Sequence, residues 1–298
     1  LLTNVVRPNL PYECDYFMHY HDRPSDPVGR DGRGGTLDPS EVLALAAAVH
    51  NVSGSLQRRP LIQFSRTTEQ EFQVAYHGLL HEIRTAVDSD GNPLYLPVNH
   101  PSYDNNTIEN LIRMFHGQQA VWELMEQQKR HYSRVAMLRN DVFYVTPIDI
   151  YRLPERPWVD TGNEFAVVPG FSQHPVNDRL VYGPYDAVRI WAATRFARLR
   201  RHAQMMRVQH PGDGLHSERF LAYGIFPAIR DAGVPLRVDR DLCFLRVRSD
   251  RSVRLDDCRI PGGTTELTRR AVEAILRRPC VMNRTTDSKL IHLECRDV

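Results

Sequence analysis

Three neighbouring residues with complementary side chains, Arg139, Asn140 and Asp141, interrupt an otherwise apolar stretch. Apolar residues occupy 135–138 before them and 142–144 after them, as expected for a buried strand that ends in polar side chains. A carboxylate at such a point can hold a divalent cation, and an adjacent arginine can bind phosphate oxygens. A salt bridge that closes the strand end explains the same residues. The tripeptide alone leaves both interpretations open.

Two further motifs place acidic side chains beside predicted element boundaries. Asn177 and Asp178 follow one predicted strand and precede Gly183, a residue that permits close backbone approach. Ser217 and Glu218 open a predicted helix, where the helix dipole favours a carboxylate in the first turn. Structural roles compete in both cases, because Asn-Asp pairs favour turns and Ser or Glu residues cap helices.

The elements that must position these motifs alternate between strands and helices. Period-2 and period-3.6 apolar patterns predict strands over 14–21 and 61–65, helices over 38–52 and 68–87, and a long helix containing 108–125. This order predicts an α/β fold with helices on both faces of a mostly parallel sheet, together with a C-terminal hairpin. In such sheets ligands bind beyond the carboxyl ends of the strands, where Arg139–Asp141 are expected.

The composition limits the class of protein. The 298 residues are 42% hydrophobic and 25% charged, enough for one large core or two smaller ones. The net charge is +2, and arginine supplies 36 of the 38 basic residues, because lysine occurs only at 129 and 289. Acidic and basic residues alternate without the basic stripe of a nucleic-acid groove, so no nucleic-acid partner is expected. We expect membrane contact only through a segment absent from this sequence.

The five cysteines indicate an oxidising compartment. Cys243 and Cys258 bracket two predicted strands around a Ser249–Asp250 turn, close enough for a cross-strand disulfide. Cys280 and Cys295 form a second possible pair, which leaves Cys14 unpaired. Five reduced, buried thiols remain the alternative interpretation. Three Asn-x-Ser/Thr glycosylation acceptors, beginning at 51, 105 and 283, also favour a secretory compartment.

Five segments of the chain together resemble a glycosyltransferase-like family of algae, diatoms and related protists: 14–22 with 32–39, 135–150, 167–192, 212–225 and 243–258. That family is similar in turn to GT-A nucleotide-sugar transferases. The resemblance covers nearly the whole chain and implies a single GT-A-like domain over 1–298. Residues 1–9 read as the helix after a first strand, so we expect that strand to be missing.

The resemblance gives the first motif a role at the donor. GT-A enzymes carry a short acidic motif at a strand end, where it holds Mn²⁺ or Mg²⁺ against the donor diphosphate. Arg139–Asp141 match that position, with Arg139 in the first acidic slot. Asp141 is then implied as a metal ligand, His292 as the second ligand, and Arg139 as a phosphate contact.

The remaining motifs are implied to act on the sugar and the acceptor. Asp178 would orient the sugar, with Asn177 and Gly183 beside it, and Glu218 would deprotonate the acceptor hydroxyl. The predicted function is transfer of a sugar from a nucleotide-sugar donor to a glycan or protein acceptor in the Golgi lumen. A catalytically inactive glycan-binding or scaffold protein is the alternative.

Two further expectations concern residues outside these motifs. On the strand predicted over 14–21, Asp15, His19 and His21 are expected to line the nucleotide pocket. The arginines of the segment 195–201 are expected to form a solvated helix face.

Overall fold

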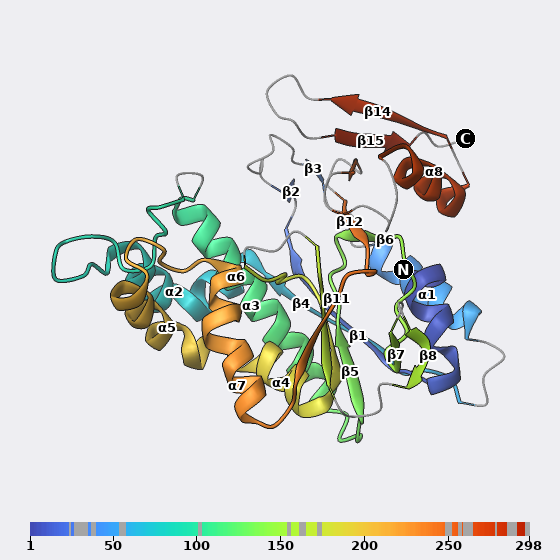
Figure 1. Ribbon diagram of the computed structural model, residues 1–298, viewed down its shortest axis with the longest axis horizontal. Coiled ribbons are helices and arrows are strands. Elements are labelled where there is room, and N and C mark those ends of the chain that lie inside the picture. The colour runs from blue at the N-terminus through green and yellow to red at the C-terminus, as the bar shows by residue number, and fades with distance from the viewer. Residues whose placement is uncertain are drawn as a thin grey trace.

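The protein has a mixed α/β fold (Figure 1). In the computed structural model the described residues are 1–23, 25–26, 35–36, 40–53, 58–100, 103–153, 156–160, 165–171, 175–247, 252–255, 258, 265–277, 279–284 and 291–295. At some strand positions, including 292, the backbone alone is described. The predicted α/β class is confirmed.

The described helices are α1 Ser40–Val52, α2 Glu69–Thr85, α3 Asn105–Glu126, α4 Tyr185–Ala193, α5 Arg195–Gln209, α6 Ser217–Phe220, α7 Phe226–Asp231 and α8 Thr265–Leu276, with short helical turns η1 Leu2–Val6, η2 Arg7–Tyr12 and η3 Leu221–Ile225. The described strands are β1 Tyr16–Asp22, β2 Ser25–Asp26, β3 Gly35–Thr36, β4 Ile62–Thr68, β5 Arg134–Met137, β6 Val142–Tyr144, β7 Arg152–Leu153, β8 Arg156–Asp160, β9 Ala166–Pro169, β10 Val181–Pro184, β11 Leu236–Asp239, β12 Phe244–Arg246, β13 Val253–Arg254, β14 Cys280–Arg284 and β15 Ile291–Cys295.

Side-chain caps begin the two long helices close to their predicted positions. Thr68, the last residue of β4, is also the N-cap of α2 and forms a reciprocal capping box with Glu71. Asp104 caps α3 by accepting a hydrogen bond from the Thr107 backbone N–H at 2.7 Å. No loop separates β4 from α2, so one residue serves both elements.

The sheets are small and mixed, so the prediction of a mostly parallel sheet is wrong for the main one. Strands β1 and β4 are parallel neighbours. A separate four-stranded sheet has the order β11-β9-β10-β5, in which β10 is antiparallel to both neighbours and β9 and β11 are parallel. Residues 170–180 join β9 to β10 without a described helix, and such a connection suits antiparallel neighbours.

The two faces of this sheet pack against different kinds of structure. Ala166 and Val168 pack in a hydrophobic cluster with residues of α3, α4 and α7. Val167 and Tyr182 pack on the other side against Val5 and the segment 142–150. Long helices therefore cover one face, whereas short N-terminal turns and irregular chain cover the other. The prediction of helices on both faces needs that correction.

The C-terminal part forms a small disulfide-linked layer above the main body (Figure 1). Its sheet has the order β13-β15-β14, and β14 and β15 form an antiparallel C-terminal hairpin. Disulfides join Cys243 to Cys258 and Cys280 to Cys295, with Cα–Cα distances of 5.7 and 4.1 Å. Both predicted pairs are confirmed, while the predicted Ser249–Asp250 turn lies outside the described residues. In the described part of the chain no helix is long and apolar enough to cross a membrane.

Candidate active site

A cleft of about 1700 Å³ runs beside β1 and β5. His19 and His21 line it from β1, and Asp15 lines it from the residue before that strand. Arg139 and Asp141 line it from the turn after β5. The prediction that these β1 residues line a pocket is confirmed in its geometry. The identity of the ligand stays a prediction.

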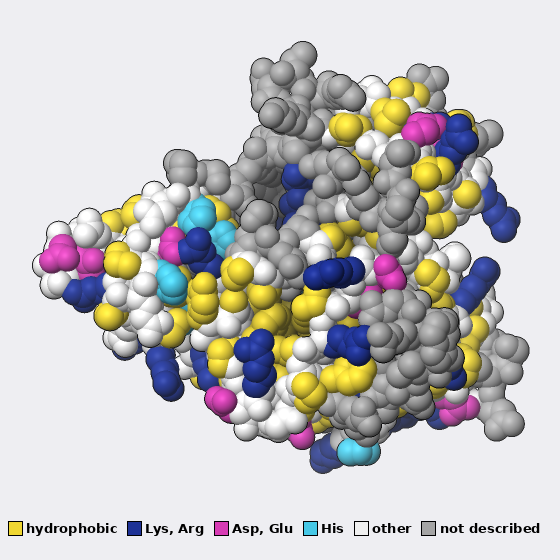
Figure 2. Space-filling view, in the orientation of Figure 1, with side chains coloured by type: hydrophobic (Ala, Val, Ile, Leu, Met, Phe, Trp, Pro, Cys, Tyr) yellow, Lys and Arg dark blue, Asp and Glu magenta, His cyan; other side chains and the backbone are white. Residues whose placement is uncertain are grey.

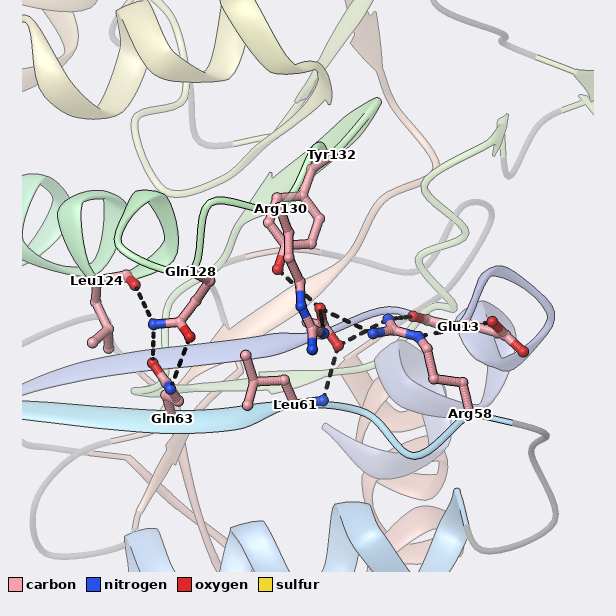
Figure 3. A network of polar contacts seen from close by, with 9 residues as sticks. Glu13, Arg58, Leu61, Gln63, Leu124, Gln128, Arg130 and Tyr132 are labelled. Atoms are coloured by element: carbon pink, nitrogen blue, oxygen red, sulfur yellow. Dashed lines mark hydrogen bonds and ion pairs between the residues drawn. The ribbon is translucent and has the colours of Figure 1, made fainter.

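A buried carboxylate fixes the start of β1 against the chain that leads into β5. The side chain of Asp15 has no exposed surface and accepts hydrogen bonds from Arg58 at 2.9 Å, Leu61 N–H at 2.8 Å, Arg130 at 2.8 Å and Tyr132 Oη at 2.9 Å (Figure 3). Burial alone would raise the pKa of Asp15, but these hydrogen bonds hold it below its usual value. The network holds one end of the cleft in a single geometry.

Arg139 and Asp141 pair with each other at the end of β5. Arg139 Nε and Nη2 donate to the two carboxylate oxygens of Asp141 at 2.7 and 2.5 Å. The two side chains are 31% and 42% exposed, so the pair is reachable from the cleft. The salt bridge that competed with ligand binding in the sequence interpretation is therefore formed in this structure.

This pairing bears on the predicted Mn²⁺ or Mg²⁺ ion. Both ions prefer several oxygen ligands, whereas each oxygen of Asp141 already accepts from Arg139. Among the described residues, no group of three metal-ligating side chains includes Asp141. The backbone of His292 lies in β15 opposite Asn283, and its side chain is outside the described atoms. The described residues do not fit such an ion at Asp141.

Two residues of the second motif have structural explanations. Asn177 Oδ1 accepts from the Arg179 backbone N–H at 2.9 Å, and its Nδ2 donates to the Phe171 carbonyl at 2.8 Å. Asn177 thus closes a turn, as the competing interpretation required. A Cβ atom on Gly183 would lie 2.7 Å from the Ala166 Cα atom, so packing of β10 on β9 explains the glycine.

Asp178 lies in the interior beside a buried cation. Asp178 is 8% exposed, and Ser217 Oγ donates a hydrogen bond to it. Arg195 is buried over the rings of Trp191 and Phe115, which corrects the prediction of a solvated arginine at that position, whereas Arg200 and Arg201 are exposed as predicted. Burial lowers the pKa of Arg195 to about 9, against the attraction of Asp178. Asp178 attracts this cation but forms no described hydrogen bond with it; Arg195 Nε donates to the Trp191 carbonyl oxygen at 2.9 Å.

Glu218 forms a carboxylate–imidazole pair at the start of α6. Its Oε2 lies 3.1 Å from His216 Nδ1, and the His216 ring stacks on Tyr103 with centroids 5.2 Å apart. No side-chain hydrogen bond caps α6, so the capping alternative for Ser217 and Glu218 is not realised. Histidine, acidic and basic side chains gather on the surface around α6 and the neighbouring end of α3 (Figure 2).

The structure therefore joins the motifs into two groups. Asp178 and Glu218 meet through Ser217 on one side, and Arg139 and Asp141 pair in the cleft. Neither Asp178 nor Glu218 is among the described residues that line the cleft. The sequence interpretation assigned these residues to one catalytic site, but in the described structure they lie in two separate groups.

A third group includes a histidine that sequence reasoning missed. His19 and His21 lie on one face of β1, and His116 of α3 packs against both, with ring centroids 5.1 and 5.2 Å away. Burial is the main reason why the pKa of each ring is lowered, to about 4 for His19. The sequence shows only that His19 and His21, two positions apart on a strand, share one face. His116 could not be added to them because it is almost 100 residues distant in the chain.

Comparisons with known proteins add no assignment. No protein-family model, no curated protein and no solved structure matches this chain.

Proposed function

We propose that the protein binds a nucleotide-sugar donor in the β1–β5 cleft and transfers the sugar to an acceptor hydroxyl. The observation that carries the proposal is the position of Arg139, at the end of β5 and on the wall of a cleft large enough for such a donor. A planar guanidinium binds two phosphate oxygens at once, as it now binds the two oxygens of Asp141.

Donor binding would exchange one anion for another at Arg139. The pair with Asp141 is part-exposed, so water weakens it, while its two parallel hydrogen bonds make it stronger than a pair with a single contact. A diphosphate carries more negative charge than a carboxylate and can therefore displace Asp141. While no donor is bound, the Asp141 carboxylate would occupy the place of the diphosphate and keep the Arg139 side chain oriented.

Glu218, the base that the sequence motifs suggested, does not line this cleft, so the transfer proposal assigns it no step. Its carboxylate lies 3.1 Å from His216 Nδ1 at the start of α6. Asp178 accepts a hydrogen bond from Ser217 and does not line the cleft, so it is assigned no contact with the sugar. The transfer proposal assigns no step to a metal ion. The disulfides support maturation in the secretory pathway.

Calorimetric titration of UDP- and GDP-sugars, with and without Mn²⁺, tests the proposal. Arg139→Gln should weaken donor binding by at least about tenfold, because one bidentate charge-assisted contact is lost. Asp141→Asn should keep or increase the affinity without Mn²⁺, because Arg139 loses its competing anion. Arg189→Gln, which removes an arginine near Asp186 on α4 away from the cleft, is the matched control.

Three results contradict the proposal: no nucleotide sugar binds, Arg139→Gln binds as tightly as the parent, or Asp141→Asn abolishes binding without Mn²⁺. A second candidate function, glycan binding without a nucleotide, is favoured by the structural uses of Asn177, Asp178 and Asp141. Binding of glycans together with indifference to nucleotides would support it.

A further inference from the structure

We propose that His19, His21 and His116 form a binding site for a divalent transition-metal ion of the zinc class. The inference stands apart from the proposed transfer reaction and from Asp141. Its basis is that the ligand nitrogens of the three rings all lie within 4.8 Å of one another.

Local structure explains how the three rings converge. Side chains alternate along a strand, so His19 and His21 project from the same face of β1. Helix α3 packs on that face and places His116 against both rings. Gly117, the next residue, adds no side chain; its Cβ position lies 3.6 Å from the His19 ring.

His19 and His21 each use one ring nitrogen in a hydrogen bond, which leaves the other nitrogen of each ring available. His21 Nε2 lies 3.1 Å from the Arg113 carbonyl oxygen, which can only accept, so Nε2 carries the proton and Nδ1 has a bare lone pair. His19 Nδ1 lies 2.9 Å from Ser65 Oγ, which can accept its proton and leave Nε2 bare. Metal-binding histidines commonly use one nitrogen in this way to orient the other.

The nitrogens left over have no partner in the described structure. His19 Nε2, His21 Nδ1 and His116 Nδ1 are all buried without a hydrogen bond. Burying an unpaired polar atom costs about 1–3 kcal/mol, and phenylalanine would fill the same space without that cost. A metal ion would satisfy all three nitrogens together.

The ligand type selects the ion. Three neutral imidazoles suit zinc, copper, nickel or cobalt, whereas magnesium and calcium require oxygen ligands. Nitrogens around a tetrahedral zinc ion lie about 3.4 Å apart, given bond lengths of about 2.1 Å, so small side-chain rotations would close the site. His19 and His21 also line the cleft, from which a water molecule can supply a fourth ligand.

Nearby charges do not exclude a cation. The side chain of Arg113 lies next to the site but contacts Glu69 at 2.6 Å and Glu109 at 3.7 Å. Arg23 contacts Glu69 as well, at 3.0 Å. Arg84 contacts Glu109 too, at 2.5 Å, so each of the three arginines is paired with a carboxylate, and the group as a whole carries one positive charge in excess.

The test is metal binding by the full-length chain after treatment with a chelator. Titration with Zn²⁺ should show one site per chain, and Co²⁺ should give the visible absorption of a tetrahedral nitrogen site. His116→Phe should weaken Zn²⁺ binding by at least about a hundredfold and abolish the rise in Tm that Zn²⁺ causes. Ser65→Ala should weaken Zn²⁺ binding by about 10- to 100-fold, because Ser65 orients His19.

One competing site must be removed in all variants. His77 and His81 are exposed one turn apart on α2, so they can bind zinc adventitiously. His77→Gln eliminates that pair and should leave the proposed site intact. The proposal is overturned if the His77→Gln protein binds no Zn²⁺, or if adding His116→Phe leaves affinity and the Zn²⁺-dependent Tm unchanged. The second outcome would identify the three rings as aromatic packing.

Discussion

Replacement of Asp15 by asparagine tests whether the carboxylate network at the start of β1 holds the two sheets together. Asparagine keeps the size and one carbonyl oxygen of the side chain, which can still accept from Leu61 and Arg58. Its amide NH₂ group takes the place of the oxygen that accepts from Arg130 and Tyr132. The contact with Arg130 would therefore become a donor–donor contact, and Tyr132 would lose a charged acceptor and have to accept from the amide instead.

The expected loss of stability follows from those two contacts. A hydrogen bond to a charged group contributes about 1.5–3 kcal/mol, and the contact with Arg130 is discounted because that side chain is 44% exposed. We expect Asp15→Asn to lower the free energy of unfolding by about 3 kcal/mol. For a chain of this size that corresponds to a decrease in Tm of about 6–12 °C.

The effect should also depend on pH in a defined direction. The pKa of Asp15 is lowered in the folded protein, so its charge stabilises the fold above the unfolded-state pKa of about 3.9. That contribution is lost as the pH falls through the folded-state pKa. The difference between parent and Asp15→Asn should therefore be constant from about pH 5 to 8 and shrink below about pH 4.

Urea denaturation followed by circular dichroism measures the difference. Asp22→Asn is the control, because Asp22 lies at the other end of β1 and pairs with Arg66, whose side chain is 64% exposed. That variant should lose less than about 1 kcal/mol. Equal losses in the two variants, or a pH-independent difference down to pH 3, would refute the reasoning about Asp15.

Three further outcomes are expected. Asp178→Asn should lower the free energy of unfolding by about 1–2 kcal/mol in urea titrations, because the buried hydrogen bond from Ser217 loses its charged acceptor; an unchanged free energy would contradict a structural role for that contact. Glu218→Gln should leave sugar transfer and donor affinity near those of the parent, measured once donor and acceptor are identified, because Glu218 does not line the cleft; a loss of about 10²–10⁴ in turnover would instead identify Glu218 as the base. Cys280→Ser should cost roughly 3 kcal/mol by removing the bridge to Cys295, and an unchanged urea midpoint would argue against that bridge.

Local signals in the sequence located the helices well. Thr68 and Glu71 form a capping box, which the sequence shows as a threonine followed three positions later by a glutamate. Helix α2 begins at Glu69, directly after Thr68. Strand directions were not predictable in the same way, because β10 pairs with β5 and β9 through contacts distant in sequence. The cysteine pairs were found because each brackets a short segment that returns on itself.

The site was predicted less well than the fold, for two physical reasons. The type of a residue does not show whether its charge interacts with a ligand or with another residue of the protein. Asp141 pairs with Arg139, and Asp178 attracts Arg195. The buried Arg195 was missed because exposed arginines surround it. A signal existed, because Arg195 shares a helical stripe with Leu199 and Met206, both of which are buried.

Because no loop separates β4 from α2, a residue inserted or deleted at this junction would rotate the whole helix about its axis relative to the strand. A helix turns by about 100° per residue, so one residue inserted between Thr68 and Glu69 would turn α2 by that angle relative to β4. Phe72 would leave the core, and Glu69 would leave Arg113. Insertions and deletions should therefore be tolerated less well at this junction than elsewhere in the chain. For the same reason, β4 and α2 should move together as one rigid unit.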